Sequence, residues 1–317
     1  MTKRTKNLYH YLLDPDVIYR AFVKSRCGKN HKREVIEFAN NLPLEIESIV
    51  SDLSADSYQV GEYTCFTVYE PKERLIKAPK FRDVVVQRAL HDLICPVFER
   101  CFIHDSYGCR VGKGTHAAAR AVQLMQRNSP KGSHYAQFDI RKYFFRVLRT
   151  CTVELLEKRI ADRRLVKLLA QFLPDEVGMP IGNLLSQLYA NIYLDPIDHF
   201  VKRELGFKRY ARYMDDFVIV GENIERLREV EPLIVNELNK YGLELSRSTF
   251  GAVEGGIGFI GHRITDERVA MNKNTVKKFY AAINMKTESQ TVISLLGHAR
   301  HTKQYPTFRD LIKERAY

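Results

Sequence analysis

Apolar residues recur along much of the chain at the three- and four-residue spacing of helices that bury one side. Residues 81–100 show this pattern, with Val85, Ala89 and Leu93 on the expected spacing, and a helix is predicted there. Thr115 follows two nearby glycines and is the expected N-cap of another helix. The same reasoning predicts further helices over residues 115–126, 152–172, 183–205 and 225–241.

Shorter β-rich runs alternate with these helices. Phe66–Tyr69 predicts a strand that stops at Glu70-Pro71, and Leu75 begins its return. Two apolar runs around Met214 predict a hairpin with an acidic tip. The two strands of this hairpin are residues 210–213 and 217–220, and further strands are expected over residues 135–140 and 259–264. This mixture predicts an α/β (α+β) protein.

Composition indicates a folded chain with a core. Of the 317 residues, 45% are hydrophobic and 28% are charged, which is typical of globular proteins and excludes wholesale disorder. The longest apolar runs are far shorter than the roughly 18 residues that cross a bilayer, so no membrane insertion is expected.

The charge is strongly basic and uneven. Lys and Arg total 50 against 38 Asp and Glu, a formal net charge of +12. Residues 1–34 hold nine basic and three acidic residues (net +6), and residues 268–317 hold ten and three (net +7). A nucleic acid is the expected partner, because neutralised phosphates release counterions. A basic protein with solvated helix faces is the alternative.

The cysteines indicate neither a disulfide framework nor a zinc site. No apolar signal run follows the first residues, so reduced thiols and a cytoplasmic location are expected. The spacing does not fit a zinc finger. The six cysteines are residues 27, 65, 95, 101, 109 and 151.

Paired carboxylates mark the candidate chemistry. Asp215 and Asp216 lie between two apolar β-runs, where like charges about 4 Å apart repel by roughly 4 kcal/mol at an effective dielectric near 20. An ordinary Asp-Asp turn is the alternative, although the apolar flanks disfavour it. Asp139 closes another apolar strand. With Asp215 it could bridge two Mg²⁺ ions, one activating a 3′-hydroxyl and one neutralising the leaving pyrophosphate.

Tyr213-Met214-Asp215-Asp216 in this setting resembles the catalytic hairpin of reverse transcriptases. The resemblance extends from about residue 66 to residue 310, and its blocks occur in the order found in that family. None of the five other blocks is specific by itself, but coincidence does not account for five blocks in the family's order. The other matching blocks are Pro71–Ile76, Ser106–Arg110 with Gly112–His116, Asp139–Phe144, Gly178–Gln187 and Phe259–Gly261.

One block departs from most of the family. Reverse transcriptases commonly carry Gln-Gly followed by Ser-Pro in the template-side block, whereas this chain has Ile181-Gly182 and Ser186-Gln187. This form resembles the enzymes of diversity-generating retroelements, which are related to group II intron-type reverse transcriptases. The resemblance implies cDNA synthesis with misincorporation opposite adenine.

The resemblance implies a role for each residue of the metal site. Asp139 and Asp215 would ligate two Mg²⁺ ions, with Mn²⁺ as an alternative. Asp216 would shape the site or act as a further ligand. Ile140 would contribute its backbone carbonyl.

Nucleotide and template contacts are also implied. Lys72 and Arg74 would contact the triphosphate, and Phe144 would exclude a 2′-hydroxyl by its bulk. Ile181 would reduce discrimination, because it replaces a side chain that normally offers polar contacts. Gly182 and Gln187 would complete the nucleotide site. Template and primer contacts are expected at Arg110, Lys113, Tyr213, Met214, Phe259, Gly261 and His298.

The implied architecture is a right-hand polymerase: fingers, a palm with an antiparallel sheet and a short helical thumb. We expect a basic N-terminal extension over residues 1–60, fingers over 61–133, a palm over 134–266 and a thumb over 267–317. His298, with His301 three residues later, would face nucleic acid from the thumb.

The implied function is RNA-directed DNA synthesis for sequence diversification in a bacterial or phage-infected cell. The substrates would be dNTPs, a template RNA and a cDNA primer, and a basic accessory variability protein would assist. A reverse transcriptase of a retron, a free-standing group II intron or an antiviral system is an alternative. A complete intron protein is disfavoured, because no C-terminal endonuclease region is expected from the sequence. A catalytically inactive RNA-binding protein is an alternative of another class, which the intact aspartates disfavour.

Overall fold

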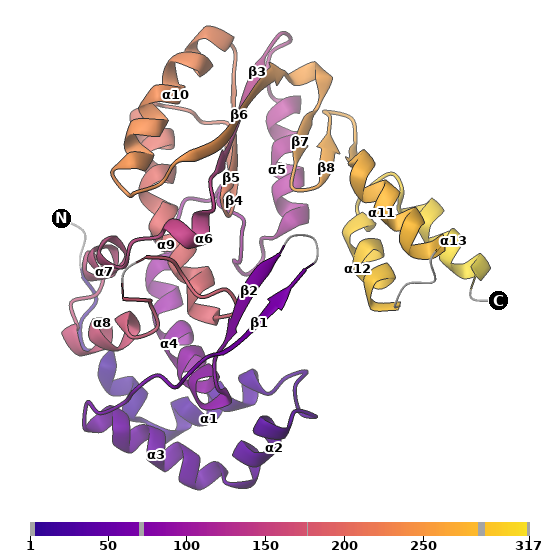
Figure 1. Ribbon diagram of the computed structural model, residues 1–317. Helices are drawn as coiled ribbons and strands as arrows, with labels where there is room; N and C mark the ends of the chain where they lie inside the picture. Colours follow the sequence, from indigo (N-terminus) through magenta and orange to yellow (C-terminus); the bar gives the residue numbers. More distant parts are fainter. Residues whose placement is uncertain (1–3, 70–72, 176, 285–288, 316–317) are drawn as a thin grey trace. The chain divides into compact units, whose positions relative to one another are not determined.

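The structure, a computed structural model, describes residues 4–69, 73–175, 177–284 and 289–315 (Figure 1). It divides into two compact units, which are described separately below. The first comprises Met1–Phe102, Lys142–Pro196 and Lys240–Leu243. The second comprises Ile103–Arg141, Ile197–Asn239 and Glu244–Tyr317.

Most of the first unit is helical. Its core includes stacked and edge-on aromatic rings of Phe22, Phe38 and Phe81, with centroids 5.3–6.2 Å apart. The region expected as a basic extension is therefore a set of helices packed on α4. The elements of this unit are η1 (Tyr9–Leu13), α1 (Pro15–Ser25), α2 (Arg33–Asn40), α3 (Leu42–Ser54), β1 (Thr64–Val68), β2 (Arg74–Ala78), α4 (Phe81–Glu99), α6 (Tyr143–Arg146), α7 (Arg149–Glu157), α8 (Arg163–Ala170) and the greater part of α9 (Leu184–His199).

The predicted strand and its return form an antiparallel hairpin. β1 pairs with β2 so that Phe66 faces Ile76 and Val68 faces Arg74. Both strands are partly exposed, and Ile181 accepts a backbone hydrogen bond from Lys77 at 2.9 Å. The template-side block therefore lies against β2.

The single helix expected over residues 152–172 is wrong: the chain breaks it into α7 and α8. Asp162 causes the break, because its backbone is extended and one carboxylate oxygen accepts from the backbone N–H of Leu165. The other oxygen accepts from Leu8 at 3.1 Å and Tyr9 at 2.9 Å. Asp162 therefore caps one helix and holds the start of η1.

The second unit contains an antiparallel sheet in the order β4-β5-β3-β6 and a three-stranded sheet in the order β7-β8-β9. Its elements are α5 (Thr115–Arg127), β3 (His134–Ile140), the end of α9, the π-helical turn η2 (Phe200–Glu204), β4 (Tyr210–Tyr213), β5 (Asp216–Gly221), α10 (Ile224–Asn239), β6 (Leu245–Ala252), η3 (Val253–Gly255), β7 (Ile257–Phe259), β8 (His262–Ile264), β9 (Val269–Met271), α11 (Lys273–Asn284), α12 (Ser289–Ala299) and α13 (Tyr305–Arg315).

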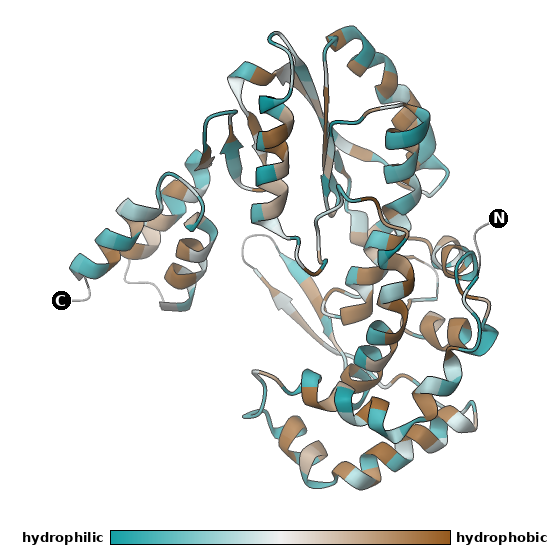
Figure 2. Ribbon diagram, turned by 180° about the vertical axis from the view of Figure 1, so that it is seen from behind, coloured by the Kyte–Doolittle hydropathy of each residue, from teal (hydrophilic) through white to brown (hydrophobic). Residues whose placement is uncertain are grey.

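Helices cover both faces of the four-stranded sheet (Figure 1). On one face, Ala118 and Val122 of α5 pack with Tyr135, Val218 and Val220. α10 contacts β3 and β5 on the other face. The helices carry both hydrophilic and hydrophobic residues, as expected when one side packs on a sheet (Figure 2). The alternation of side chains along β3 puts Gln137 and Asp139 on the same face as Tyr135.

The single strand expected over residues 259–264 is also wrong. The chain turns at Ile260 and Gly261, which have φ of 44° and 80°, and β7 and β8 pair antiparallel around them. Two successive positive φ values are typical of a type I′ hairpin turn. The apolar run concealed this turn, because isoleucine is an unusual residue in it.

Two other helix boundaries differ from the predictions. Thr115 is the first residue of α5 and Gly114 is its N-cap, with φ of 107° that favours glycine. The helix expected over 183–205 ends at His199 and continues as the π-helical η2. The strand–turn–strand around Met214 and the helices α4 and α10 lie within a residue or two of the predicted bounds.

The C-terminal helices share a small core of their own. Phe279 and Phe308 stack with centroids 3.6 Å apart, and Met271, Ile283 and Ala299 pack around them. Within the described ranges, every helix is too short or too polar to span a bilayer. The mixed class of helices and antiparallel sheets is confirmed.

Asp162→Ala should lower the free energy of unfolding by about 1–3 kcal/mol, because one cap and two further backbone N–H groups lose their acceptor. Asp162→Asn, which retains an acceptor oxygen, should lose clearly less. Urea denaturation followed by circular dichroism measures both. Equal losses in the two variants would contradict the capping role.

Candidate active site

The three predicted acids come together at one end of the four-stranded sheet. Asp139 is the register partner of Asp216 on the neighbouring strand β5. Asp215, at the turn between β4 and β5, accepts a hydrogen bond through its backbone carbonyl from the N–H of Ile140 at 3.1 Å. Antiparallel pairing thus joins residues that are more than 70 positions apart in the sequence.

Asp216 lies in a buried and negatively charged environment. Desolvation raises its pKa to about 7, and the carboxylates of Asp139 and Asp215 contribute in the same direction. Hydrogen bonds from Gln137 Nε2 at 2.9 and 3.1 Å act in the opposite direction, as does Arg247. The acids therefore repel one another, and the surroundings compensate only in part.

Asp139 is held from the opposite strand β6. The Ser246 hydroxyl donates to Asp139 Oδ1 and, at 3.1 Å, to its backbone carbonyl. The β3–β6 register shifts between Asp139 and Ile140. This irregularity terminates regular pairing beside the carboxylates, as β-bulges commonly do next to active sites.

The acids suit a hard dication. Mg²⁺ prefers carboxylate oxygens and often uses one or two protein carboxylates together with substrate phosphates. Among the residues that the structure describes, no group of three or more His, Cys, Asp or Glu side chains is arranged to hold a metal ion by itself. Asp139, Asp215 and Asp216 would hold the ion, with substrate completing its shell.

The turn that carries the acids has unusual backbone geometry. Met214, its first central residue, has φ of 55°, which is uncommon for a residue other than glycine. Tyr213 is half-buried, and desolvation raises the pKa of its hydroxyl. Arg212 donates from Nη1 to the Met214 carbonyl at 3.1 Å. Template or primer contacts of Tyr213 and Met214 remain predictions.

Arg110 and Lys113, expected to contact the template or primer, bind backbone carbonyls of their own segment. Arg110 Nη1 donates to Ile103 at 2.7 Å and to Ser106 at 2.9 Å. Lys113 Nζ donates to the carbonyl of His104 at 2.9 Å. Both residues therefore stabilise the loop before α5, and their contacts with nucleic acid remain predictions.

The predicted primer-side residues lie at the β7–β8 turn. Phe259 is 1% exposed and packs in the core beneath α5, so its ring does not reach solvent. Gly261 lies close to His298, because an added Cβ would come within 3.0 Å of the imidazole Nε2. The His298 ring lies 4.3 Å from that of His262, and burial lowers the pKa of both imidazoles.

Four predicted nucleotide-site residues belong to the first unit. Gly182 has φ of 117°, and an added Cβ would come within 3.1 Å of the Lys77 carbonyl. Ile181 is partly buried beside it, and Gln187 is exposed. The Phe144 ring is partly buried, 5.7 Å from that of Tyr143.

The expected triphosphate contacts are described only in part. Arg74 is exposed as the first residue of β2. Lys72 lies outside the described residues. The role of each remains a prediction.

The sequence interpretation missed several residues that shape the site. Gln137 stands two positions before Asp139 on the same strand, so strand periodicity could have identified it. Ser246 and Arg247 are far away in the sequence, and only the β3–β6 register brings them near Asp139. Arg212 was within the predicted hairpin, but Asp198, with which it forms an ion pair at 2.7 Å, carried no sequence signal.

The chain belongs to the reverse transcriptase (RNA-dependent DNA polymerase) family, whose profile matches residues 70–264. The enzyme class predicted from the sequence, an RNA-directed DNA polymerase, is confirmed at this level.

Two relatives illustrate the similarity. Protein YkfC of Escherichia coli K12 is 26% identical over 279 residues, covering 72% of this chain and 73% of YkfC. The group II intron-encoded protein LtrA of Lactococcus lactis is 27% identical over 211 residues, covering 61% of this chain. The match spans only 35% of LtrA. The similarity to group II intron-type enzymes is confirmed.

Solved telomerase structures share the fold. Apo telomerase from Candida tropicalis superimposes with a TM-score of 0.53 at 12% identity, covering 71% of this chain and 52% of the telomerase chain. Its C-terminally truncated form gives 0.50 at 14% identity, covering 67% and 55%. The polymerase-like fold expected from the sequence is confirmed.

Asp216→Asn should stabilise the metal-free protein at pH 8 by on the order of 4 kcal/mol. The pKa of about 7 in the folded chain exceeds the ordinary value of 3.8. The contribution of protonated Asp216 to the free energy of unfolding is therefore fully present below pH 4. It declines as the pH rises and is lost above about 7, where folded Asp216 ionises. Asparagine avoids that loss and still accepts from Gln137.

Chemical denaturation with EDTA at several pH values between 4 and 8 measures this difference. The gain should shrink steadily toward pH 4. Asp266→Asn, at an exposed loop position of the same unit, provides the matched control. A pH-independent difference would contradict the raised pKa of Asp216.

Proposed function

We propose that the chain extends a DNA primer along an RNA template, using two divalent ions held by Asp139, Asp215 and Asp216. The observation that carries this proposal is the pairing of Asp139 with Asp216 beside Asp215, in a chain of the reverse transcriptase family. LtrA is encoded by a group II intron, and one telomerase of this fold is described in complex with a fragment of telomeric RNA. An RNA partner is consistent with the net charge of +12.

The residues of the site contribute mainly charge and position. Bound dications would neutralise the phosphates and lower the cost of developing charge during phosphoryl transfer. Asp139 and Asp215 act as the principal ligands, and Asp216 stays close enough to shape the site. Gln137 and Ser246 orient the carboxylates of Asp216 and Asp139 through hydrogen bonds. Catalysis then depends on positioning and electrostatic stabilisation.

Nucleotide selection is assigned to residues of the first unit. Phe144, five residues after Asp139 in the sequence, excludes a 2′-hydroxyl by its bulk. Lys72 and Arg74 contact the triphosphate, where charge-assisted hydrogen bonds are strong. Gly182 allows the template-side block to approach β2, and Gln187 is exposed for contact with substrate.

Within the family, we assign the chain to the enzymes of diversity-generating retroelements. Ile181 and Gln187 carry this assignment, because they depart from the usual template-side block. Misincorporation opposite adenine follows from the loss of a polar contact at residue 181. A basic accessory protein and a structured RNA would be its partners.

A group II intron-type enzyme without selective errors is the second candidate, favoured by the similarity to LtrA. Both candidates have a right-hand organisation. We propose for it an N-terminal extension over residues 1–60, fingers over 61–133, a palm over 134–266 and a thumb over 267–317. They differ in the error spectrum of the cDNA.

Asp215→Ala should reduce primer extension on an RNA template by about 100-fold or more, since it removes a principal metal ligand. Extension with Mg²⁺ and four dNTPs, resolved on a sequencing gel, measures the rate. Glu229→Ala, an exposed acid on α10, should retain the wild-type rate. No extension by the wild-type chain, with RNA binding intact, would favour the inactive RNA-binding alternative.

Ile181→Gln should lower errors opposite adenine by about 10-fold, the effect of about one regained hydrogen bond. Sequencing cDNA made on templates with and without adenines measures the error spectrum. Ile36→Gln makes the same substitution on α2, at a side chain that is 45% exposed, and should leave the spectrum unchanged. An equal error rate at all four template bases in wild type would support the second candidate.

A further inference from the structure

The turn that carries Asp215 and Asp216 stores backbone strain. Met214 has positive φ and the next residue does not, the pattern of a type II′ hairpin turn. Glycine is the usual residue at this position, because a side chain there is sterically unfavourable. A strained non-glycine residue persists only where surrounding contacts hold it, and such residues cluster at functional sites.

Arg212 supplies one of these contacts from beneath the turn. Its side chain is 1% exposed, and its Nη1 donates to the Met214 carbonyl at 3.1 Å. The same guanidinium donates from Nη2 to the Ser106 hydroxyl at 3.3 Å. Burying a guanidinium cation lowers the free energy of unfolding unless an anion lies beside it.

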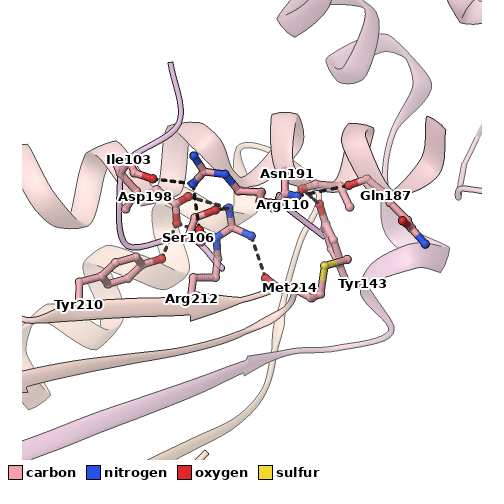
Figure 3. Close-up of polar contacts among 11 residues, drawn as sticks. Ile103, Ser106, Arg110, Tyr143, Gln187, Asn191, Asp198, Tyr210, Arg212 and Met214 are labelled. Atoms are coloured by element: carbon pink, nitrogen blue, oxygen red, sulfur yellow. Dashed lines mark hydrogen bonds and ion pairs between the residues drawn. The ribbon is translucent and has the colours of Figure 1, made fainter. Parts of the chain in front are cut away.

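Asp198, in the last turn of α9, is that anion (Figure 3). Its two oxygens accept from Arg212 Nε and Nη2, each at 2.7 Å, and its side chain is fully buried. The Tyr210 hydroxyl donates to Asp198 Oδ1 at 2.5 Å. Burial raises the pKa of Tyr210 well above its ordinary value, so the hydroxyl keeps its proton. The fork geometry fixes the guanidinium plane.

A second contact comes from Gly108. A Cβ at that residue would lie 2.6 Å from Met214 Sδ and 2.9 Å from the Met214 backbone nitrogen. Only glycine therefore lets the 103–110 loop reach the turn. Two backbone hydrogen bonds just before Gly108, from Arg212 to the Asp105 carbonyl and from Tyr107 to the Arg212 carbonyl, hold the loop against β4.

We propose that Arg212, clamped by Asp198, and Gly108 are positioning residues that hold the strained Met214 turn so that the following aspartates meet the dication. This inference rests on the proposed polymerase function and adds residues that do not themselves touch the ion. Neither residue contributes a ligand atom. Loss of the Arg212–Met214 hydrogen bond, or a methyl group at Gly108, lets the turn relax and moves Asp215 and Asp216 with it.

Two substitutions perturb the turn by independent routes. Arg212→Lys keeps a cation beside Asp198 but loses the guanidinium fork and its N–H to Met214. Gly108→Ala leaves the ion pair intact and pushes on Met214 by one methyl group, so it tests the proposal even where Arg212→Lys does not fold. Leu238→Ala opens a cavity at a fully buried position in α10 and provides a matched control for lost stability.

Mn²⁺ binding to the full-length chain, measured by electron paramagnetic resonance, provides a readout besides activity. Arg212→Lys and Gly108→Ala should each weaken Mn²⁺ binding by about 10-fold. Each should also raise the Mg²⁺ concentration needed for half-maximal primer extension, with the KM for primer–template unchanged. Leu238→Ala should lower Tm and leave Mn²⁺ affinity unchanged.

Wild-type Mn²⁺ affinity in folded Gly108→Ala or Arg212→Lys would overturn the positioning role, as would an equal loss in Leu238→Ala. Failure of the wild-type chain to extend primers would instead count against the proposed function. The Mn²⁺ measurements would still decide whether these residues position the aspartates.

Discussion

Repulsion among three carboxylates is the constraint on which the second unit depends. Asp139, Asp215 and Asp216 lie where desolvation and mutual charge favour protonation, as the raised pKa of Asp216 indicates. Without an ion this arrangement costs stability, and a chain optimised for stability alone would replace or separate the acids. Their retention together is therefore a functional feature.

Different strands of the sheet place the acids and provide their hydrogen-bond partners. β3 and β5 bring the acids together through main-chain pairing, which is insensitive to side-chain charge. β6 contributes Ser246, and Gln137 shares the face of Asp139 and donates to Asp216. Hydrophobic packing of α5 and α10 on the two faces stabilises the sheet. This stabilisation offsets the repulsion among the carboxylates at its end.

Local signals were sufficient for much of the fold and for the acids. The hairpin around Met214 and the strand ending at Asp139 followed from apolar runs bounded by polar residues, because alternation and turn chemistry are short-range. Asp162 and the Ile260-Gly261 turn were missed, since the first acts through Leu8 and Tyr9 and the second conceals a type I′ turn within an apolar run. The Asp162 contacts with Leu8 and Tyr9 are tertiary, whereas the Ile260-Gly261 turn is local but has an unusual residue at its first position.

The same limit explains which parts of the site escaped prediction. Asp139 and the Asp215–Asp216 pair could be recognised because each closes or interrupts its own apolar strand. Asp198 could not, since a single acid in a helix is indistinguishable from a solvated one until Arg212 is found buried against it.

Two matched sequence blocks of the second unit, Ser106–Arg110 and the Met214 hairpin, contact each other. Ser106 and Gly108 contact the residues of the hairpin block directly, one through Arg212 and the other through its closeness to Met214. Loss of Ser106 would remove a hydrogen-bond partner of the buried Arg212 guanidinium, and a side chain at Gly108 would collide with the Met214 turn. These two blocks therefore belong to one three-dimensional arrangement, in which a glycine and a buried arginine maintain the backbone that the aspartates require.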